Sequence, residues 1–493
     1  MTTALNTEVK PLVKYVDAIC GSGKSYNLKR DIEQGDKVFK RYLLVMPTIE
    51  LCSQFSEDLK ILKVKSVNIQ ADRTSATLQL KQAMAADYFP RHIVCTHEAF
   101  KQYCYRAFHD QEMRDLLKGF NVFVDEIPTA TFGAYIKVDS TQDVNDNYPF
   151  LGWLEERDGL HYVKEDHKED LLSYWQEKNA NSKELKQLLW VLLTGAGMLL
   201  DEEKHFFAYT ATPITFASLW ASEFVVMGAG VSRSEYAHFA EIALGADVVS
   251  ADQSLYPDYR RRVYPNNNVT IYAVMEESAS LDKLAYVFTN HLSELAQIVG
   301  SQFIYASNND KHTAHLQCDF QSIAMEQLGD RFGGDVVSMS SYGLNHFQHY
   351  SRAVFLGVSN DNRDVNGKWN QYADLMGWDW SVISEKRKAA RNYEQAYQFV
   401  SRCSIRNFDS RQQQVYIVPD QATALYLKQH YFENASVDCL GFDKPKAERK
   451  ARDTSKGEQT RLQIQQLKSK GHKQKDVVAM LGLSKGTVSG YWK

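Results

Sequence analysis

The feature of the sequence that most constrains the fold is a short apolar run that leads directly into a glycine-rich loop. Residues 12–16 read "LVKYV" and residues 18–25 read "AICGSGKS". The first run predicts a β-strand, and the loop after it should open a helix. This order is typical of a site that binds phosphate groups, because the backbone amides at a helix N-terminus point toward an anion.

Each residue type of this loop has a role in that interpretation. Glycines let the backbone approach phosphate oxygens, a lysine reaches the β- and γ-phosphates, and a serine hydroxyl binds Mg²⁺. The first glycine of the pattern G-x-x-x-x-G-K-[ST] is replaced by Ala18, so a glycine-rich turn without a ligand is the alternative. The candidate residues for binding ATP are Gly21, Ser22, Gly23, Lys24 and Ser25, the last also as a Mg²⁺ ligand.

The second motif is acidic: "VFVDEIP" (122–128) follows the glycine-rich loop by about 100 residues. An apolar strand that ends in Asp-Glu puts two carboxylates at the carboxyl edge of a sheet, where α/β proteins bind ligands. Asp125 can hold Mg²⁺, and Glu126 can orient or deprotonate an attacking water. Such a pair alone is more often a solvated turn, but with the glycine-rich loop it predicts ATP hydrolysis.

The chain alternates short β-rich runs with amphipathic helical stretches, which predicts parallel α/β sheets. We expect one α/β domain over residues 1–260 and a second over 261–440. A polar stretch at about 138–200 is predicted to be a helical insertion in the first domain. The sheet pattern of that domain is expected to resume at "HFFAYTATP" (205–213).

Composition restricts the class of protein further. At 493 residues, with 44% hydrophobic and 24% charged residues, the chain suits two or three globular domains. It contains no apolar run of about 18 residues, and its first residues lack the pattern of a signal peptide. The seven cysteines are scattered without a C-x-x-C pair, so neither a disulfide framework nor a zinc site is predicted. We therefore expect a cytoplasmic protein without a membrane partner.

The C-terminal part is strongly basic. Residues 444–493 carry thirteen Lys or Arg against four Asp or Glu, a balance of +9. Since the whole chain has a net charge of −4, the remainder carries −13. A basic tail on an acidic body favours a polyanionic partner, although a solvated disordered tail is the alternative. Residues 441–457 are charged and poor in large apolar groups, which is typical of a linker.

Residues 458–493 carry the pattern of a small helical domain. A helix is predicted at Gln474–Leu481, Gly482 permits a turn, and Ser484 can cap a second helix. This segment resembles the helix-turn-helix modules of resolvases and small phage regulators, which bind DNA; a protein-docking module is the alternative. The candidate DNA contacts are Lys473, Lys475, Lys485, Thr487, Ser489 and Tyr491.

Further motifs resemble those of superfamily 2 helicases of the DEAD/DEAH-like kind. "MPTIELCSQF" (46–55) is similar to motif Ia, P-T-x-E-L-x-x-Q, "VCTHEAF" (94–100) stands where motif Ib is expected, and "YTATP" (209–213) is similar to motif III. The resemblance implies two RecA-like domains and contacts with a nucleic acid strand. Those contacts are expected at Thr48, Thr96, Thr210 and Thr212.

The second domain carries two more such motifs. "SMSSYGLNHF" (338–347) is similar to motif V through Gly343, Leu344 and Asn345, and "YQFVSRCSIRN" (397–407) to motif VI, Q-x-x-G-R-x-x-R. In that family the arginines of motif VI reach the γ-phosphate held by the first domain. The resemblance implies Arg402 as this arginine finger. The candidate catalytic residues are Lys24, Asp125, Glu126, Gln398, Arg402 and Arg406, and Gly343 and Asn345 are added to the nucleotide site.

The combined prediction is an α/β protein with two RecA-like domains in tandem and a small all-α helix-turn-helix domain. It implies an ATP-dependent DNA helicase that uses ATP and Mg²⁺ on single-stranded or duplex DNA. Initiation of replication on a mobile element, with replication or recombination proteins as partners, is one interpretation. The alternatives are a duplex DNA translocase for restriction, repair or recombination, and a DNA-binding regulator switched by ATP. An RNA helicase is a further alternative, although a helix-turn-helix would give it no evident benefit.

Overall fold

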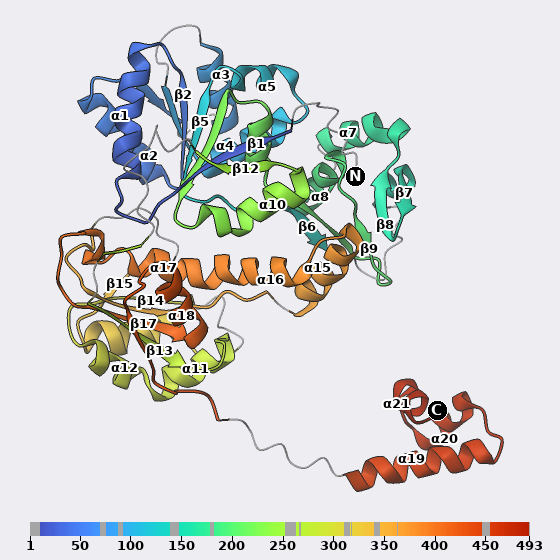
Figure 1. Cartoon of the computed structure of the whole chain (residues 1–493). Helices are drawn as coiled ribbons and strands as arrows, with labels where there is room; N and C mark the ends of the chain where they lie inside the picture. The colour runs from blue at the N-terminus through green and yellow to red at the C-terminus, as the bar shows by residue number, and fades with distance from the viewer. Residues whose placement is uncertain are drawn as a thin grey trace. The chain divides into compact units, whose positions relative to one another are not determined.

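The chain divides into two compact units, residues 1–443 and 444–493. The computed structural model describes residues 10–69, 75–86, 92–138, 147–177, 182–251, 263–265, 268–309, 316, 318–339, 346–361, 363–445 and 454–492. The first unit contains two parallel sheets flanked by helices, and the second consists of helices (Figure 1). The predicted α/β fold class, with two parallel-sheet domains in tandem followed by an all-α segment, is confirmed.

The first parallel sheet carries the glycine-rich loop. Within the described residues it has seven strands in the order β12-β1-β11-β5-β2-β4-β3. The strands of its centre are buried apolar runs, as expected when helices cover both faces of a parallel sheet. The strands are β1 (Leu12–Asp17), β2 (Tyr42–Met46), β3 (Ser66–Asn68), β4 (His92–Thr96), β5 (Asn121–Asp125), β11 (Glu223–Gly228) and β12 (Asp247–Ser250).

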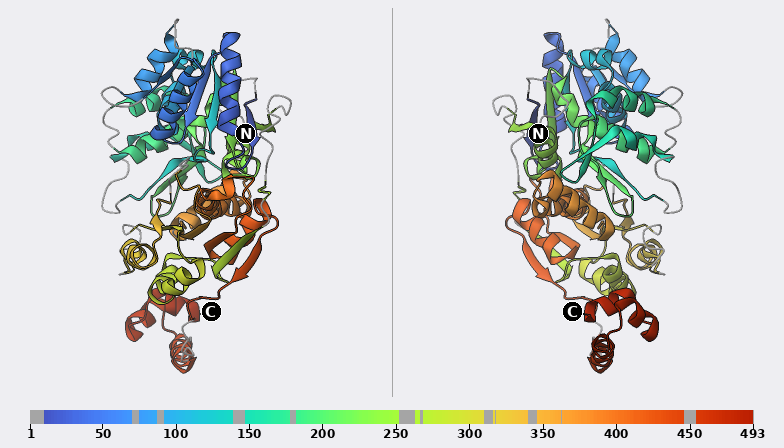
Figure 2. Two further views of the ribbon diagram at one scale, coloured as in Figure 1. Left: turned by 90° about the vertical axis from the view of Figure 1, so that its left-hand side faces the viewer. Right: turned by 90° about the vertical axis from the view of Figure 1, so that its right-hand side faces the viewer.

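Helices cover both faces of this sheet, as the side views in Figure 2 show. On one face α1 (Lys24–Lys37) and α2 (Ile49–Ile61) pack through residues such as Leu28 and Leu59. The other face is covered by α3 (Ala76–Ala85), α4 (His97–Ala107), α5 (Gln111–Leu117) and α10 (Glu235–Leu244). Because strands and helices alternate, the carboxyl ends of the strands and the loops that follow lie at one edge.

The insertion after β5 is partly what the sequence predicts. It contains α7 (Lys168–Gln176) and α8 (Lys183–Leu193), but also a hairpin of β7 (Leu154–Arg157) and β8 (Leu160–Val163). A small antiparallel sheet, β6-β10-β9, stands at its base. Its strands are β6 (Thr131–Ile136), β9 (Leu199–Leu200) and β10 (Phe206–Ala211).

The strand expected at "HFFAYTATP" forms, but it lies outside the main sheet. This segment forms β10, which pairs with β6 and β9 and not with the parallel strands. The short helix α9 (Pro213–Phe216) follows, and only β11 re-enters the main sheet, between β1 and β5. Local pattern predicts that a strand forms but not which sheet it joins.

The second parallel sheet has the order β15-β14-β16-β17-β13-β18 within the described residues. Most of its strands coincide wholly or in large part with the β-rich runs "NNVTIYAV", "QFIYAS", "DVVSMSS", "RAVFLGV" and "QQVYIV" of the second predicted α/β domain. The strands are β13 (Val269–Met275), β14 (Ile304–Ser307), β15 (Asp335–Val336), β16 (Arg352–Leu356), β17 (Gln414–Asp420) and β18 (Ser436–Cys439). The helices are α11 (Leu281–Asn290), α12 (Leu292–Val299), α14 (Phe320–Ala324), α17 (Glu394–Val400) and α18 (Gln421–His430).

Between β16 and α17 the chain leaves the second sheet and docks on the first domain. This docked arm consists of α15 (Arg363–Met376) and α16 (Trp380–Lys388), which run along the first domain toward β6 and β9 in Figure 1. Trp369 and Tyr372 are buried in the core of the first domain, and the Tyr372 hydroxyl lies 2.9 Å from the carbonyl oxygen of Gly197. The predicted boundary at 260/261 falls between β12 and β13, but this arm belongs by its packing to the first domain.

In the C-terminal unit three helices enclose a small core. Helix α19 (Thr454–Ser469) begins inside the segment predicted as a linker, whereas α20 (Gln474–Leu481) and α21 (Lys485–Tyr491) occupy the predicted positions. Gly482 adopts the left-handed conformation, with φ of 60°, and Ser484 accepts a hydrogen bond from the Thr487 amide. Ile464, Val477 and Val488 form the buried core.

Two further expectations concern cysteines and membranes. All seven cysteines are free thiols, so the expectation of no disulfide framework agrees with the structure. Over the described part of the chain, every helix is too short or too polar to cross a bilayer.

Candidate nucleotide-binding site

The glycine-rich loop joins β1 to α1 at the carboxyl edge of the first sheet. Gly21 and Gly23 have φ values of 82° and 86°, a conformation that glycine adopts without steric cost. Gly23 is the N-cap of α1 and has no side chain with which to satisfy the amides of the first turn. An N-terminus of this kind favours a phosphate group.

Lys24 folds its side chain back into the loop. Its Nζ donates hydrogen bonds to the carbonyl oxygens of Ala18 (2.9 Å) and Ile19 (3.1 Å), and the side chain is 6% exposed. These bonds hold a buried ammonium group next to the uncapped helix N-terminus. The positive charge of Lys24 and the partial positive charge of the helix N-terminus therefore favour an anion at the same place.

Ser25 and Asp125 bring a hydroxyl and a carboxylate together. Ser25 Oγ lies 3.5 Å from Asp125 Oδ2, at the end of β5. Burial, and then the charge of Glu126, raise the pKa of Asp125 to about 7, against a smaller lowering effect of Lys24. A divalent cation would therefore relieve an unfavourable buried charge.

This oxygen pair fits Mg²⁺, which is commonly held by one or two protein oxygens together with water and substrate phosphates. In the described residues no group of three or more His, Cys, Asp or Glu side chains could hold a metal ion by itself. Ser25 and Asp125 are the residues that would hold Mg²⁺.

Glu126 has a strained backbone and two supporting contacts. Its φ is 64°, which is uncommon for a residue with a side chain. The carbonyl oxygen of the preceding Asp125 accepts a hydrogen bond from His97 Nε2 at 2.8 Å. Burial lowers the pKa of His97 to about 4, so the neutral ring can act as this donor. Gln398 Nε2 donates to Glu126 Oε2 at 3.2 Å.

The second domain contacts the glycine-rich loop directly. The Cys20 amide donates to the Tyr397 hydroxyl at 2.9 Å, and the Tyr264 hydroxyl donates to the Cys20 carbonyl oxygen at 3.0 Å. A Cβ atom on Gly21 would lie 3.0 to 3.2 Å from backbone and Cβ atoms of Arg406. The loop and the second domain are therefore packed without space for a larger residue at this position.

The two candidate arginines occupy different environments. Arg406 lines the nucleotide cavity, and its Nε donates to the Ser401 carbonyl oxygen at 2.6 Å. Arg402 is 1% exposed inside the second domain, where its Nη1 donates to the Ser338 carbonyl oxygen at 3.1 Å. The assignment of Arg402 as the arginine finger is therefore wrong for this arrangement, because its guanidinium group is part of the domain core.

The cavity that Arg406 lines has a volume of about 350 Å³ and lies between the two domains; it is called the nucleotide cavity below. Most of its lining comes from the first domain, and Gln348 and Arg406 come from the second. Glu126 also lines a neighbouring cavity of about 440 Å³, together with Gln398 and Arg233. The lining of the first cavity is Cys20, Gly21, Gly23, Lys24, Ser25, Tyr26, Lys29, Met46, Leu51, Gln54, Phe55, Asp58, Asp125, Glu126, Gln348 and Arg406.

The threonines expected to contact a nucleic acid fall into two groups. Thr48 and Thr96 are the N-caps of α2 and α4, at the ends of the neighbouring strands β2 and β4, and both are partly exposed. Thr210 and Thr212 are 3% and 1% exposed. The prediction for the latter two is wrong in this arrangement, because Thr210 in β10 and Thr212 at the start of α9 are both buried inside the first domain.

Not every predicted position can be compared with the structure. Gly343 and Asn345 of the motif V candidate lie outside the described residues. In the C-terminal unit Lys473, Lys475 and Ser489 are at least partly exposed, as a DNA contact requires. Tyr491 packs against the small core, and Thr487 Oγ1 lies 2.9 Å from Ser484 Oγ. Lys485 is the first residue of α21.

Several residues of the site were missed from the sequence. His97, Tyr264 and Tyr397 contact the glycine-rich loop or the acidic pair, although none of the three was a candidate site residue. A signal for Tyr397 existed in the sequence. Glu394, Tyr397 and Gln398 have the i, i+3, i+4 spacing of one helix face, and Gln398 was already a candidate.

No family model and no curated protein matches the chain in sequence. Among solved structures, S. tokodaii Xpd4 is similar with a TM-score of 0.42 and 11% identity, over 87% of this chain and 96% of that one. The DUF1998 helicase MrfA bound to DNA has a TM-score of 0.36 and 11% identity, over 88% and 48% of the two chains. S. cerevisiae Dbp5 bound to RNA and ADP BeF3 has a TM-score of 0.38 and 10% identity, over 88% and 86%.

Proposed function

We propose that this protein is an ATP-dependent DNA helicase or translocase. The observation that carries the proposal is the convergence on one interdomain cavity of a phosphate loop, a buried carboxylate beside a serine hydroxyl, a second carboxylate and an arginine from the other domain. A cavity built from both domains makes hydrolysis depend on their approach, which is how nucleotide turnover can drive movement.

In this proposal the phosphates of ATP lie on the amides of the loop and the first turn of α1. Lys24 exchanges its bonds to the loop carbonyls for the β- and γ-phosphate oxygens. Ser25 and Asp125 would hold Mg²⁺, which would supply charge neutralisation at the phosphates.

Glu126 accepts the proton of a water whose oxygen attacks the γ-phosphorus. The bond from that phosphorus to the β–γ bridging oxygen breaks, which gives ADP and inorganic phosphate. Gln398 holds the Glu126 carboxylate in place. Arg406, rather than Arg402, is proposed to stabilise the charge that develops on the γ-phosphate oxygens.

DNA is proposed as the partner because of the C-terminal unit. Residues 444–493 carry a balance of +9, and the helices α20 and α21 are joined by a short turn at Gly482. Phosphate neutralisation by lysines supplies much of the affinity of such modules for duplex DNA. Thr48 and Thr96 are the proposed contacts of the motor itself, at adjacent strand ends.

The test is ATP hydrolysis without nucleic acid and with single-stranded DNA, duplex DNA or RNA. Lys24→Ala is the blank, and Lys37→Ala, an exposed lysine at the end of the same helix, is its matched control. Stimulation by DNA that disappears only in Lys24→Ala supports a DNA motor. Hydrolysis indifferent to every nucleic acid, or absent from the wild type, contradicts it. Displacement of a DNA strand or of a triplex strand then separates unwinding from duplex translocation.

Two cellular roles are compatible with this proposal. One is to start replication on a phage or plasmid, and the other is in restriction, repair or recombination. We expect them to differ in the DNA that residues 458–493 recognise. A regulator switched by ATP is a second candidate, because the tyrosine contacts to Cys20 hold the two domains together on the phosphate loop itself. That candidate predicts slow hydrolysis that DNA does not change.

A further inference from the structure

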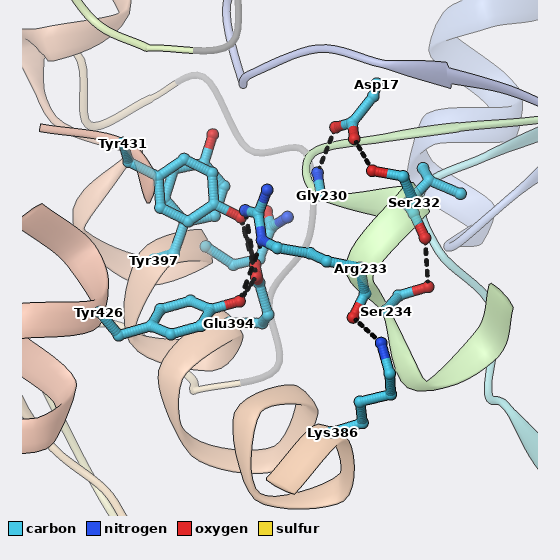
Figure 3. A network of polar contacts seen from close by, with 12 residues as sticks. Asp17, Gly230, Ser232, Arg233, Ser234, Lys386, Glu394, Tyr397, Tyr426 and Tyr431 are labelled. Atoms are coloured by element: carbon cyan, nitrogen blue, oxygen red, sulfur yellow. Dashed lines mark hydrogen bonds and ion pairs between the residues drawn. The ribbon is translucent and has the colours of Figure 1, made fainter. Parts of the chain in front are cut away.

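One face of α17 contacts three separate elements of the first domain. Glu394, Tyr397 and Gln398 are spaced i, i+3, i+4, so their side chains project from one side of the helix. Tyr397 accepts a hydrogen bond from the phosphate loop, and Gln398 donates one to Glu126. Glu394 pairs with Arg233, which lies on neither of these elements (Figure 3). The position of this short helix therefore controls two contacts of the nucleotide site.

The pair of Arg233 and Glu394 is well enclosed. Arg233 Nη2 lies 3.5 Å from Glu394 Oε1, and the side chains are 30% and 19% exposed. Arg233 Nε also donates to the Tyr426 hydroxyl at 3.2 Å, and the guanidinium lies 4.9 Å from the centre of the Tyr431 ring. The hydroxyls of both tyrosines donate to the Glu394 carboxylate, at 2.5 to 2.9 Å.

Arg233 is connected to the start of the phosphate loop. It ends a 3-10 turn after β11, the strand that lies between β1 and β5. The Gly230 amide and the Ser232 hydroxyl donate to the two oxygens of Asp17, at 2.5 and 2.7 Å (Figure 3). Asp17 is the last residue of β1, directly before the loop. The turn is thus fixed to the strand that carries the loop.

The same turn holds the chain on both sides of a π-helical segment, Ala389–Tyr393. Before that segment, Lys386 Nζ donates to the Arg233 carbonyl oxygen at 2.9 Å, and Arg387 Nη1 donates to Glu235 Oε1 at 3.1 Å. After it comes Glu394. Single π-helical turns are frequent at functional sites and interrupt the regular helix. The docked arm and α17 therefore meet at an irregular joint fixed at both ends by residues 231–235.

We propose that Arg233 is a positioning residue for ATP hydrolysis: by holding Glu394 it sets α17 so that Gln398 meets Glu126 and Arg406 faces the nucleotide cavity. This inference rests on the proposed hydrolysis of ATP at that cavity. Arg233 itself does not line the nucleotide cavity, so its loss leaves the phosphate loop and the Mg²⁺ ligands in place. Loss of Arg233 should therefore lower the turnover number, whereas the affinity for ATP should change much less.

The experiment measures steady-state ATP hydrolysis by the full chain carrying Arg233→Ala, Glu394→Gln or both. We expect each single substitution to lower kcat at least ten-fold and to change KM for ATP less than three-fold. Because both act through one contact, the double variant should lose little more than the worse single variant. Arg233→Lys keeps a positive charge and should recover part of the loss. Lys137→Ala, which breaks the exposed pair of Lys137 with Asp364 on the docked arm, is the control and should keep wild-type kcat.

The proposal is overturned if Arg233→Ala keeps wild-type kcat, if only KM rises, or if the two substitutions are additive. Glu394→Gln keeps the shape of the side chain and serves if Arg233→Ala does not fold. Hydrogen exchange gives a readout independent of turnover. In the Arg233 variants the amides of 394–400 should exchange at least ten-fold faster, with those of α4 unchanged. If hydrogen exchange in α17 is unchanged in the Arg233 variants, the inference is wrong, whether or not the wild type hydrolyses ATP. If exchange is faster but the wild type does not hydrolyse ATP, only the proposed function is wrong.

Discussion

Gln398 donates a hydrogen bond to the Glu126 carboxylate at 3.2 Å, although 272 positions separate the two residues in the chain. The contact joins the helix of one domain to the strand end of the other, at the wall of the nucleotide cavity. A carboxylate with a strained backbone and a partner on the opposite domain can be placed correctly only when the domains are together. Substitution of either residue should therefore lower the rate of ATP hydrolysis.

Glu126→Gln is expected to lower kcat by about 10²- to 10⁴-fold, the usual contribution of a general base. Gln398→Ala should cost roughly ten-fold, because it removes the support and not the base itself. Steady-state ATPase assays with separate kcat and KM values measure both. Gln395→Ala, on the same helix beside the contacting face, is the control for α17. Equal rates for Gln398→Ala and wild type would show that this contact does not hold the base.

Gly21→Ala should separate the domains at the phosphate loop. The new Cβ would lie 3.0 Å from the Arg406 carbonyl oxygen, and φ of 82° adds backbone strain. We expect ATP turnover to fall at least ten-fold by kinetic assay. Gly245→Ala is the matched control, because Gly245 also has a positive φ of 68° but open space around it. If both variants lose activity equally, the strain and not the domain contact is the cause.

The two arginines should respond to substitution in different ways. Arg406→Ala is expected to reduce kcat by about 10³-fold, as for other arginine fingers, with the fold retained. Arg402→Ala should instead lower the free energy of unfolding by about 2 kcal/mol or more, because it removes a buried side chain and its hydrogen bond to Ser338. Thermal unfolding beside kinetics distinguishes these outcomes. A stable Arg402→Ala protein without activity would restore the sequence-based assignment.

The sequence locates the glycine-rich loop and the acidic pair better than it predicts how the two arginines lie. The phosphate loop and the Asp125–Glu126 pair could be read because each is a contiguous string at the end of an apolar strand. The sequence did not allow a correct choice between Arg402 and Arg406 as the arginine that faces the cavity. A 3-10 turn at Ser404–Arg406 lies between them and turns the second arginine toward the cavity, and the strings alone do not encode that turn.

His97 should make stability depend on pH. Burial holds its folded-state pKa near 4, below the ordinary 6.5, so the unfolded chain takes up a proton first as the pH falls. This residue's contribution is full above pH 6.5 and is lost toward pH 4, by up to about 1.4 kcal/mol per pH unit. Denaturant unfolding of wild type and His97→Asn measures it. The stability difference between them should shrink from pH 7 to pH 4, and a constant difference would contradict the neutral buried ring.

Removal of residues 444–493 should separate DNA affinity from ATP hydrolysis. These residues form a compact unit with its own core, so the remaining chain keeps the whole nucleotide cavity. We expect basal ATPase within about two-fold of wild type and duplex DNA affinity reduced at least ten-fold, with a weaker dependence on salt. Fluorescence anisotropy at two salt concentrations measures this. Lys37→Ala in the full chain is the control for loss of a lysine elsewhere.

Strand order is the part of the fold that the sequence could not supply. Most of the strands were predicted, because each is a short apolar run with turn residues around it. The pairing of β11 with both β1 and β5, and of β10 with β6, depends on contacts between segments far apart in the chain. For the same reason the sequence does not predict that Arg233 meets Glu394, or that α15 and α16 pack on the first domain.

The docked arm determines the order in which the protein can fold. Trp369 and Tyr372 complete the core of the first domain, yet they lie about 120 residues after the last strand of its sheet. During synthesis the first domain must wait, with apolar surface uncovered, until more than half of the second has left the ribosome. A fragment that stops at residue 260 should thus be prone to aggregate, because it lacks the two aromatic side chains that complete its core.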